Sequence, residues 1–443
     1  MLSFEEYKAL AFEAATKKGC SAAEVYFTDG EQFSANVLGG QLDEYSVEHS
    51  FGLNLRVQFD GKDGYAYTEV LDDPEALVER AVDNARSSES PDVHPMQGKC
   101  EYEKVAPPET KVIKMSPAEK IAYAAELEKQ FLASDPRAKR AQYSAIQTAK
   151  NTVRLHNTLG LEADTTRESA FAILGTILEQ DGVLRDAFVV KEGDELLDKD
   201  AMIKEGIEKT VEQFGASPVP SGEYRVMIRN EAMASMLAAF SSMFSADSAQ
   251  KGLSLLAGME GKAIAAECVT LMDDPFYAEN PRAFDAEGVP SVTKKVIENG
   301  VLTTLLHNLK TAAKAGVAST SNAGRSASGP VGVSPSNFFI KKGEASYEEM
   351  IKKLENGLII TDVSGLHAGL NPVSGDFSLI AKGLLVKDGE IVRSVDQITV
   401  AGNFITMMKA VTAVGADLKF GMPMGARVGS PSVIVEKLMV SGS

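Results

Sequence analysis

Apolar and polar positions follow a repeated order along the first half of the chain. Helical periodicity over residues 4–18 comes directly after Ser3 and Glu6, which are spaced as a capping box. A run of alternating segments follows, and a second helical segment then begins at Asp73-Pro74 and continues to about residue 87. The alternating segments are separated by glycine-rich turns and predict an antiparallel meander with strands at residues 23–28, 33–38, 41–49 and 51–59.

The same order recurs after a proline-rich connection at residues 88–115. Ser116 and Glu119 repeat the capping-box spacing, with Pro117 at the first helical position, and predict a helix to about residue 133. Further alternating segments predict strands at residues 138–149, 153–157, 161–179 and 183–191, followed by a helix at about 200–214. Both blocks therefore have the order helix, meander, helix, which fits either a distant duplication or a common α+β solution.

The second half of the chain is rich in glycine, serine and short strand-like runs. Its residues 230–244 carry apolar side chains at helical spacing, which is typical of a stripe that faces a core. Residues 316–337 form a long loop, whose role as a gate, an interface or a flexible segment stays open. We therefore predict an α+β fold, with two small helix–meander–helix units followed by a larger strand-rich α+β domain. The predicted domains are residues 1–108, 109–219 and 220–443.

Charge and composition narrow the classes of function. The 443-residue chain has a net charge of −17, which repels the phosphate backbones of nucleic acids. Its first residues, MLSFEEYKAL, lack the pattern of a signal peptide, and no uncharged apolar run is long enough to cross a membrane. The three cysteines lie far apart without a CxxC pair, which favours reduced thiols. We therefore expect a cytoplasmic protein that does not bind nucleic acids or membranes directly.

Several common catalytic motifs are missing. The sequence has no HExxH, no GxSxG, no GxGxxG and no glycine loop that ends in Lys-Ser or Lys-Thr. No two of the five histidines lie within one helical turn, which excludes a pair of histidine metal ligands on one element. The glycine-rich stretch around Arg325 lacks the phosphate-binding lysine, so a plain loop is favoured there.

The stretch GLHAGLNPVSGDFS, at residues 365–378, gathers polar side chains in a turn between two strand-like runs. A neutral His367 near Asp376 would serve as a general base, with Asn371 and Ser374 orienting a substrate. The alternative is local turn chemistry, because Asn-Pro, Ser-Gly and Gly-Asp pairs are common in turns and their side chains often bind nearby backbone. These four residues are the candidate substrate-binding residues.

With these motifs the chain resembles the TldD/PmbA metallopeptidase-related family, in particular its PmbA branch, which is also called TldE or modulator of DNA gyrase. The resemblance covers nearly the whole length. It rests on the segments GLHAGLNPVSGDFS, GNFITMMKAVTAVG, NGVLTTLLHNLKTAAKAGVASTSNAGR and GSPSVIVEKLMVSG.

The resemblance also implies which zinc ligands this chain lacks. In the TldD branch, an HExxxH motif at a strand-to-helix junction and a cysteine near the C-terminus bind zinc. The matching junction reads NEAMAS, so Asn230 and Ser235 stand at the histidine positions and Glu231 at the glutamate, while Pro423 stands at the cysteine position. Asparagine and serine are poor zinc ligands. The resemblance therefore implies no metal or other cofactor in this chain, and zinc in a TldD-type partner.

On this basis we expect a subunit of a TldD-type zinc metallopeptidase complex that is inactive alone and acts in proteolysis of unfolded peptides and in peptide maturation. Its implied partners are a TldD-like catalytic subunit and unfolded peptides, with a homodimer as the alternative assembly. Two other functions stay open. One is a peptide-binding or chaperone-like module, and the other is a metal-independent hydrolase that uses His367 and Asp376.

Overall fold

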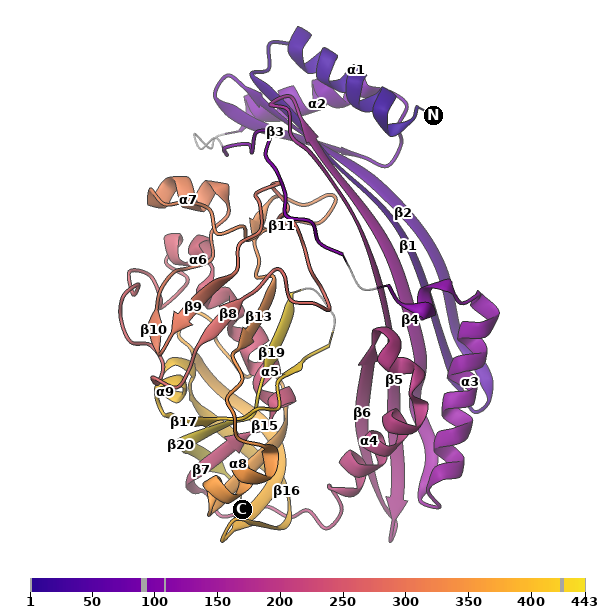
Figure 1. Ribbon diagram of the computed structural model, residues 1–443, viewed down its shortest axis with the longest axis vertical. Helices are drawn as coiled ribbons and strands as arrows, with labels where there is room; N and C mark the ends of the chain where they lie inside the picture. Colours follow the sequence, from indigo (N-terminus) through magenta and orange to yellow (C-terminus); the bar gives the residue numbers. More distant parts are fainter. Residues whose placement is uncertain (1, 89–93, 107–108, 423–425, 443) are drawn as a thin grey trace. The chain divides into compact units, whose positions relative to one another are not determined.

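The computed structural model describes residues 2–88, 94–106, 109–422 and 426–442 (Figure 1). The chain divides into two compact units. The first unit comprises Met1–Thr210 with two later segments, Ala278–Ser291 and Asn308–Gly332. The second unit comprises Val211–Tyr277, Val292–His307 and Val333–Ser443. The predicted α+β class is confirmed, because each unit combines helices with antiparallel or mixed sheets.

The first unit is built on one six-stranded antiparallel sheet in the order β3-β2-β1-β4-β5-β6. Its strands are β1 (Ala22–Leu38), β2 (Gln41–Phe59), β3 (Lys62–Thr68), β4 (Ala138–Asn157), β5 (Glu162–Gln180) and β6 (Val183–Glu192). The two sequence blocks share this sheet, because β1 pairs with β4 from Glu24–Asn157 to Asn36–Ala145. The predicted breaks inside β1, β2 and β4 were wrong. At the predicted breaks, β1 and β4 are paired along both edges and β2 is paired with β1, which keeps these short polar stretches extended.

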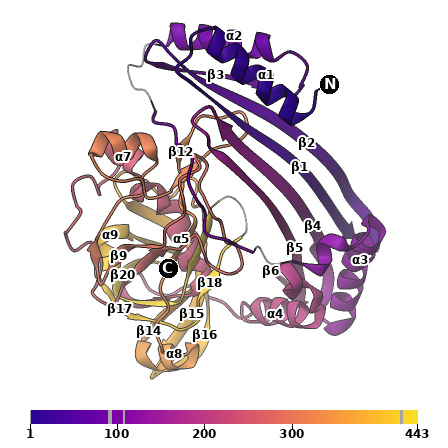
Figure 2. The same cartoon turned by 45° about the horizontal axis from the view of Figure 1, so that its top comes forward.

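Helices cover this sheet at both ends of its long strands. They are α1 (Phe4–Lys17), α2 (Pro74–Ser87), α3 (Pro117–Ser134) and α4 (Lys199–Val211). Figures 1 and 2 show α1 beside α2 near β3, and α3 and α4 near the opposite end of the strands. Both predicted capping boxes are confirmed, since Ser3 and Ser116 each exchange bonds with the glutamate three residues later. Buried apolar side chains of α1 and α2, including Tyr7 and Leu77, share one core with β1–β3.

The later segment Asn308–Gly332 of the first unit carries α7 (Leu309–Ala315) and β11 (Ala323–Gly324), and β12 (Gly332–Val333) follows at its end. Arg325 lies directly after β11 and is almost fully buried, with 1% of its side chain exposed. Its guanidinium lies 3.8 Å from the ring centroid of Tyr26 and 3.3 Å from the carboxylate of Glu24, both on β1. Arg325 therefore anchors the long loop to the sheet.

The second unit contains a barrel-like sheet in the order β16-β15-β14-β7-β20-β17. Its strands are β7 (Gly222–Ile228), β14 (Gly357–Ser364), β15 (Asp376–Lys387), β16 (Glu390–Asn403), β17 (Val411–Val414) and β20 (Val433–Ser441). Strand β16 also pairs with β20 through Val400 and Val440, which closes the ring β16-β15-β14-β7-β20. Closure leaves fewer unpaired strand edges and gives a stiff frame for the loops it carries.

A second sheet in this unit has the order β10-β9-β8-β13-β19-β18. Its strands are β8 (Leu271–Asp273), β9 (Lys294–Glu298), β10 (Val301–Leu302), β13 (Asn337–Ile340), β18 (Lys419–Phe420) and β19 (Arg427–Ser430). The helices are α5 (Asn230–Phe240), α6 (Ala246–Gln250), α8 (Tyr347–Leu354) and α9 (Phe404–Lys409). The apolar stripe predicted on residues 230–244 is confirmed as core. Its Phe240 is fully buried and stacks on Phe404 with ring centroids 4.5 Å apart.

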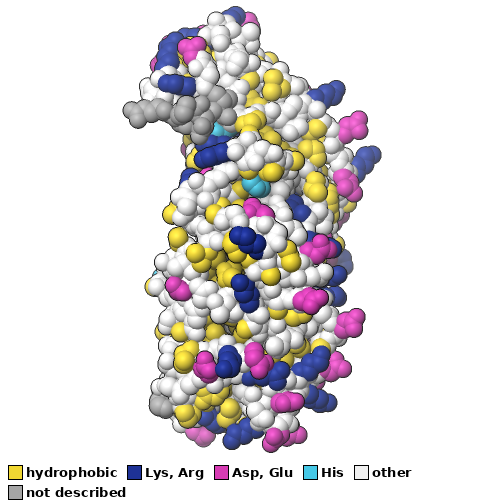
Figure 3. Space-filling view, turned by 90° about the vertical axis from the view of Figure 1, so that its left-hand side faces the viewer, with side chains coloured by type: hydrophobic (Ala, Val, Ile, Leu, Met, Phe, Trp, Pro, Cys, Tyr) yellow, Lys and Arg dark blue, Asp and Glu magenta, His cyan; other side chains and the backbone are white. Residues whose placement is uncertain are grey.

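The surface is mixed in charge. Figure 3 shows one face of the molecule, on which Lys and Arg side chains are interspersed with Asp and Glu. This face offers no continuous basic stripe of the kind that nucleic-acid binding requires. Among the described residues, no helix is both long and apolar enough to cross a membrane.

Candidate functional site

The predicted junction lies where β7 ends and α5 begins in the second unit. The strand is buried at Val226, Met227 and Ile228, and the chain then turns into α5 at Arg229, the N-cap residue. Asn230 is thus the first helical residue rather than the cap. Glu231 and Ser235 follow one turn apart on the same helix, and all three side chains are partly buried. Asn230, Glu231 and Ser235 therefore all lie in the first turns of α5.

Each polar group of Asn230 has a partner inside the protein. Its side-chain amide donates to the carbonyl oxygen of Asp417 at 2.9 Å, and its side-chain oxygen accepts from the backbone N–H of Glu231 at 2.8 Å. Its own backbone N–H donates to the Ser432 hydroxyl at 3.2 Å. That hydroxyl in turn donates to the Asp417 carboxylate at 2.6 Å. These bonds tie the start of α5 to the segments on either side of β18 and β19.

Glu231 and Ser235 are also held locally. The Ser235 hydroxyl donates to the backbone carbonyl of Glu231 at 2.9 Å, one turn back along the helix. The Glu231 carboxylate lies 2.7 Å from the ammonium of Lys419 on β18, and 32% of each side chain is exposed. The sequence indicated Glu231 but not Lys419, Asp417 or Ser432, because these partners come from a segment almost two hundred residues further along the chain.

This set of side chains does not fit the zinc ion that the family resemblance brings to mind. Zinc takes thiolate, imidazole and carboxylate ligands, and of the residues above only Glu231 and Asp417 offer a carboxylate. The first is paired with Lys419 and the second with Ser432. Over the described ranges, no group of three or more His, Cys, Asp or Glu side chains could hold a metal ion. Pro423 lies outside the described residues.

The loop between β14 and β15 carries the four candidate substrate-binding residues. Asn371 organises the turn, because its side-chain oxygen accepts from the backbone N–H groups of Val373 and Ser374 at 2.9 and 3.3 Å. Backbone bonds from Asn371 to Asp376 and from Gly375 to Asn371, both 2.8 Å, close the loop. The loop is therefore a built structure with a fixed backbone, as local turn chemistry predicted.

His367 and Asp376 are both exposed, but the described structure gives no bond between them. The Asp376 carboxylate instead accepts from the side-chain amide of Asn403 at 3.0 Å. Hydrogen bonds from Asn403 and Ser374 lower the pKa of Asp376 below its ordinary value, so this carboxyl group is ionised at neutral pH. The loop thus presents an exposed imidazole and, separately, an exposed carboxylate that is already bonded to Asn403.

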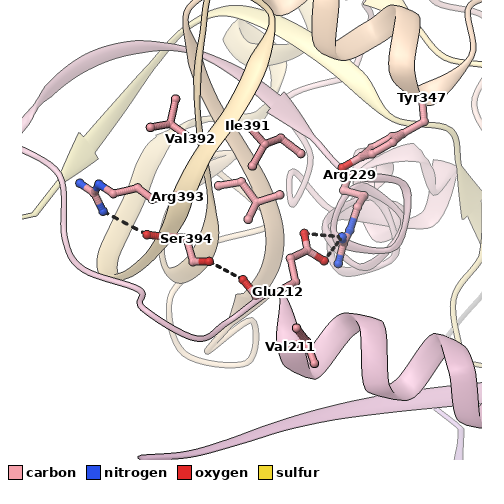
Figure 4. A pocket seen from close by; sticks show the side chains of 9 residues that line it. Val211, Glu212, Arg229, Tyr347, Ile391, Val392, Arg393 and Ser394 are labelled. Carbon is pink, nitrogen blue, oxygen red and sulfur yellow. Dashed lines mark hydrogen bonds and ion pairs between the residues drawn. The ribbon is translucent and has the colours of Figure 1, made fainter. Parts of the chain in front are cut away.

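A second polar site, not indicated by the sequence, lies behind the junction. A cavity of about 350 Å³ is formed wholly within the second unit (Figure 4). Arg229, directly before the NEAMAS motif, points into it and binds both carboxylate oxygens of Glu212 through Nη1, at 3.0 and 2.9 Å. In the sequence, the one feature that pointed to this site was the position of Arg229 directly before the NEAMAS segment. Its partner Glu212 belongs to the connection after α4, where pattern alone assigns no role.

The fold defines a multidomain α+β protein. Residues 23–85 match the PmbA/TldA metallopeptidase domain 1, residues 111–214 the central domain, and residues 221–442 the C-terminal domain. The chain belongs to the PmbA/TldD metallopeptidase family. The family prediction made from the sequence is therefore confirmed.

Individual relatives agree with this assignment. The metalloprotease PmbA of Escherichia coli O157:H7 is 25% identical over 453 residues, covering 99% of this chain and 96% of that protein. A solved Thermotoga maritima structure, described as a modulator of a DNA gyrase, is 33% identical with a TM-score of 0.90 and covers 99% of this chain and 100% of its own. Thermococcus kodakarensis TldE has the same fold, with a TM-score of 0.89 at 22% identity and with coverage of 98% and 100%.

Proposed function

We propose that this chain is a non-catalytic, PmbA/TldE-like subunit of a cytoplasmic TldD-type zinc metallopeptidase that cleaves unfolded peptides and matures peptide precursors. One observation carries the proposal. The family scaffold is complete over residues 23–442 apart from short connections, yet the side chains of Asn230 and Ser235 bond the backbone carbonyls of Asp417 and Glu231. An accessory subunit needs the family fold but does not need side chains that bind zinc.

The pair between Glu231 and Lys419 supports this role. A glutamate that acts as general base in a metallopeptidase takes a proton from a metal-bound water. Here the Glu231 carboxylate lies 2.7 Å from the ammonium group of Lys419. This ion pair offsets the negative charge of the carboxylate and occupies an oxygen that would otherwise accept a proton from water. In the proposal, this chain contributes a wall to the peptide chamber, and the TldD-type partner holds the zinc.

The loop at residues 365–376 is the proposed peptide-contacting part of that wall. Its backbone is fixed by internal bonds, while His367 and Asn371 are exposed. A rigid loop with exposed donors and acceptors binds a peptide at low entropic cost. The independent hydrolase is not favoured, because Asp376 binds Asn403 and gives His367 no orienting carboxylate.

The test is cleavage of an unstructured fluorogenic peptide by four samples. These are this chain alone, a TldD-type subunit alone, the mixture, and the mixture with a zinc chelator. We expect activity only in the mixture without chelator. Chelator-resistant cleavage by this chain alone would overturn the proposal, and peptide binding by this chain without any cleavage in the mixture would favour the chaperone-like alternative.

A matched pair of variants tests the role of the loop. His367→Ala should raise the KM of the mixture for the peptide and leave kcat nearly unchanged, because the residue would bind substrate without touching the reacting bond. The control is His49→Ala, which removes another exposed histidine, 57% exposed, from β2. Equal effects of the two variants would argue against peptide contact at His367.

A further inference from the structure

The cavity behind the junction combines a charged floor with an apolar wall. Its floor is formed by Arg229, Glu212 and Tyr347, which Figure 4 shows directed toward one another from three different segments. Its wall contains Leu384, Ile391 and Val392 among other residues. A cavity of about 350 Å³ lies at the lower end of the range for small-molecule sites. It suits a small molecule rather than an extended chain.

The charged floor has unused hydrogen-bonding capacity. Both bonds from Arg229 to Glu212 are made by Nη1, and the same guanidinium also bonds the Tyr347 hydroxyl, which still leaves other N–H donors of its five. The Glu212 carboxylate has acceptor positions beyond the two that this contact uses. The pair is not closed off, since 18% of the Arg229 side chain and 25% of the Glu212 side chain stay exposed. A guest in the cavity can therefore reach both a cation and an anion.

Tyr347 adds a neutral donor beside this pair. Burial raises the pKa of its hydroxyl above the ordinary value, and the nearby Glu212 carboxylate acts in the same direction, although the Arg229 charge opposes it. The hydroxyl therefore keeps its proton at neutral pH. An arginine with a tyrosine hydroxyl is a strong combination for binding a carboxylate.

The wall of the cavity exposes apolar side chains that water solvates poorly. Ile391 is 46% exposed and Val392 is 55% exposed, and both lie on β16 next to the tight turn after β15. Leu384, on the neighbouring strand β15, is buried. Covering Ile391 and Val392 with an apolar group would contribute roughly 25 cal/mol for each Å² removed from water.

The other arginine of the cavity has a different task. Arg393 donates to the backbone carbonyls of Ser217 and Pro218 at 2.6 and 2.9 Å, so it fixes the connection that follows Glu212. The Ser394 hydroxyl donates to the backbone carbonyl of Glu212. These contacts hold the Glu212 backbone whatever its side chain does, so the carboxylate position is prepared before a guest arrives.

We propose that this cavity binds a free α-amino acid with an apolar side chain, of the size of leucine. Its carboxylate faces Arg229 and Tyr347, its ammonium faces Glu212, and its side chain packs on Ile391 and Val392. The assignment rests on one arrangement: the Arg229 cation and the Glu212 anion lie next to each other in a cavity that is also lined by exposed apolar side chains. These three features match the carboxylate, the ammonium and the apolar side chain of such an amino acid. The site needs neither zinc nor a partner subunit. This proposal can therefore be tested independently of the proposed peptidase role.

The experiment is calorimetric titration of the full chain with four probes. These are L-leucine, L-leucinamide without the carboxylate, 4-methylpentanoate without the ammonium, and L-serine without the apolar side chain. We expect saturable binding of L-leucine, and dissociation constants at least about tenfold weaker for the other three, because each lacks one charged or apolar contact.

Variants then assign the site. Glu212→Gln should weaken L-leucine about tenfold and leave 4-methylpentanoate unchanged, since only the ammonium faces Glu212. A merely destabilised pocket would weaken both probes. Val392→Asp should weaken L-leucine, whereas the control Val183→Asp, at a valine that is 45% exposed on β6, should not.

Three results would overturn the assignment. The first is the absence of saturable binding for all four probes, and the second is L-leucine binding that neither Glu212→Gln nor Val392→Asp changes. Equal affinity for L-leucine and L-leucinamide would also contradict it, because Arg229 and Tyr347 would then have no carboxylate to recognise.

Discussion

Replacing Arg325 by methionine should destabilise the first unit strongly. Methionine keeps much of the apolar volume of the side chain and removes only the guanidinium. That group is stacked 3.8 Å from the ring centroid of Tyr26 and paired at 3.3 Å with Glu24. Glu24 is 2% exposed, so the substitution leaves its carboxylate buried without this partner.

The expected loss of folding free energy follows from the ion pair with Glu24 and the stacking on Tyr26. Removing one member of a buried ion pair costs about 3–5 kcal/mol, and a desolvated cation–π contact is worth about 2 kcal/mol. Both losses involve the same guanidinium, so they are not additive. We expect the free energy of unfolding to fall by about 3–5 kcal/mol in total, which corresponds to a decrease in Tm of roughly 6–20 °C for a unit of this size.

Hydrogen exchange locates the effect while thermal unfolding measures its size. In Arg325→Met, amides of residues 318–332 and of β1 around Glu24 should lose protection, whereas those of the barrel in the second unit should not. Adding Glu24→Gln should recover at least about 1 kcal/mol, because an amide is less costly to bury than an unpaired carboxylate. A loss below about 1 kcal/mol, or a double variant no more stable than Arg325→Met, would refute this account of the anchor.

Three further results are expected. Burial raises the pKa of Glu287 to about 8, so the folded first unit holds this proton more tightly than the unfolded chain does. The stability of the unit should therefore fall as pH rises from about 4.5 to 8, by as much as about 5 kcal/mol. In denaturation series recorded at different pH values, Glu287→Gln should remove this part of the pH dependence. Asn230→His, Ser235→His and Pro423→Cys combined should create a zinc site measurable by metal titration, since they restore imidazole and thiolate ligands. Asn403→Ala should lower stability by about 1 kcal/mol and accelerate amide exchange in the 371–376 loop, because Asn403 caps α9 and binds that loop.

Each of these has its own control. An unchanged pH slope in Glu287→Gln would show that another buried group, such as Asp285, is responsible. A folded triple variant that binds no zinc would count against the alignment of the junction. Asn403→Ser keeps an N-cap hydroxyl but loses the amide, so it should restore α9 without restoring the loop; equal exchange in both variants would contradict the bond from Asn403 to the loop.

Local features could be predicted from the sequence because their partners are close along the chain. The pairs Asp181-Gly182, Asn299-Gly300 and Asp388-Gly389 have the composition of two-residue hairpin turns; all three connect paired strands, and both residues of each turn have positive φ. Those conformations suit Asn, Asp and Gly. The capping boxes succeeded for the same reason.

The features that were predicted wrongly or not at all depend on residues that are distant along the chain. The break predicted near residue 30 is absent, because β1 is paired on one side with β2 and on the other with β4 more than a hundred residues away. Arg325 meets Glu24 across 301 positions, and the Asn230 amide meets Asp417 across 187. Residue patterns carry no information about which of many distant groups becomes the partner. The sequence indicated candidate residues, but it did not indicate the bonds that these residues make.

The way the first unit is assembled has a consequence for synthesis on the ribosome. Its sheet is complete in sequence by Thr210, but Arg325, which neutralises Glu24, belongs to a segment that ends only at Gly332. The 122 residues from 211 to 332 take about 6–24 s to translate at roughly 5–20 residues per second. During that interval Glu24 and Tyr26 have no partner from this segment. The nascent first unit should therefore remain a client of chaperones until the anchor emerges, and slowing translation between these positions should lower the yield of folded protein.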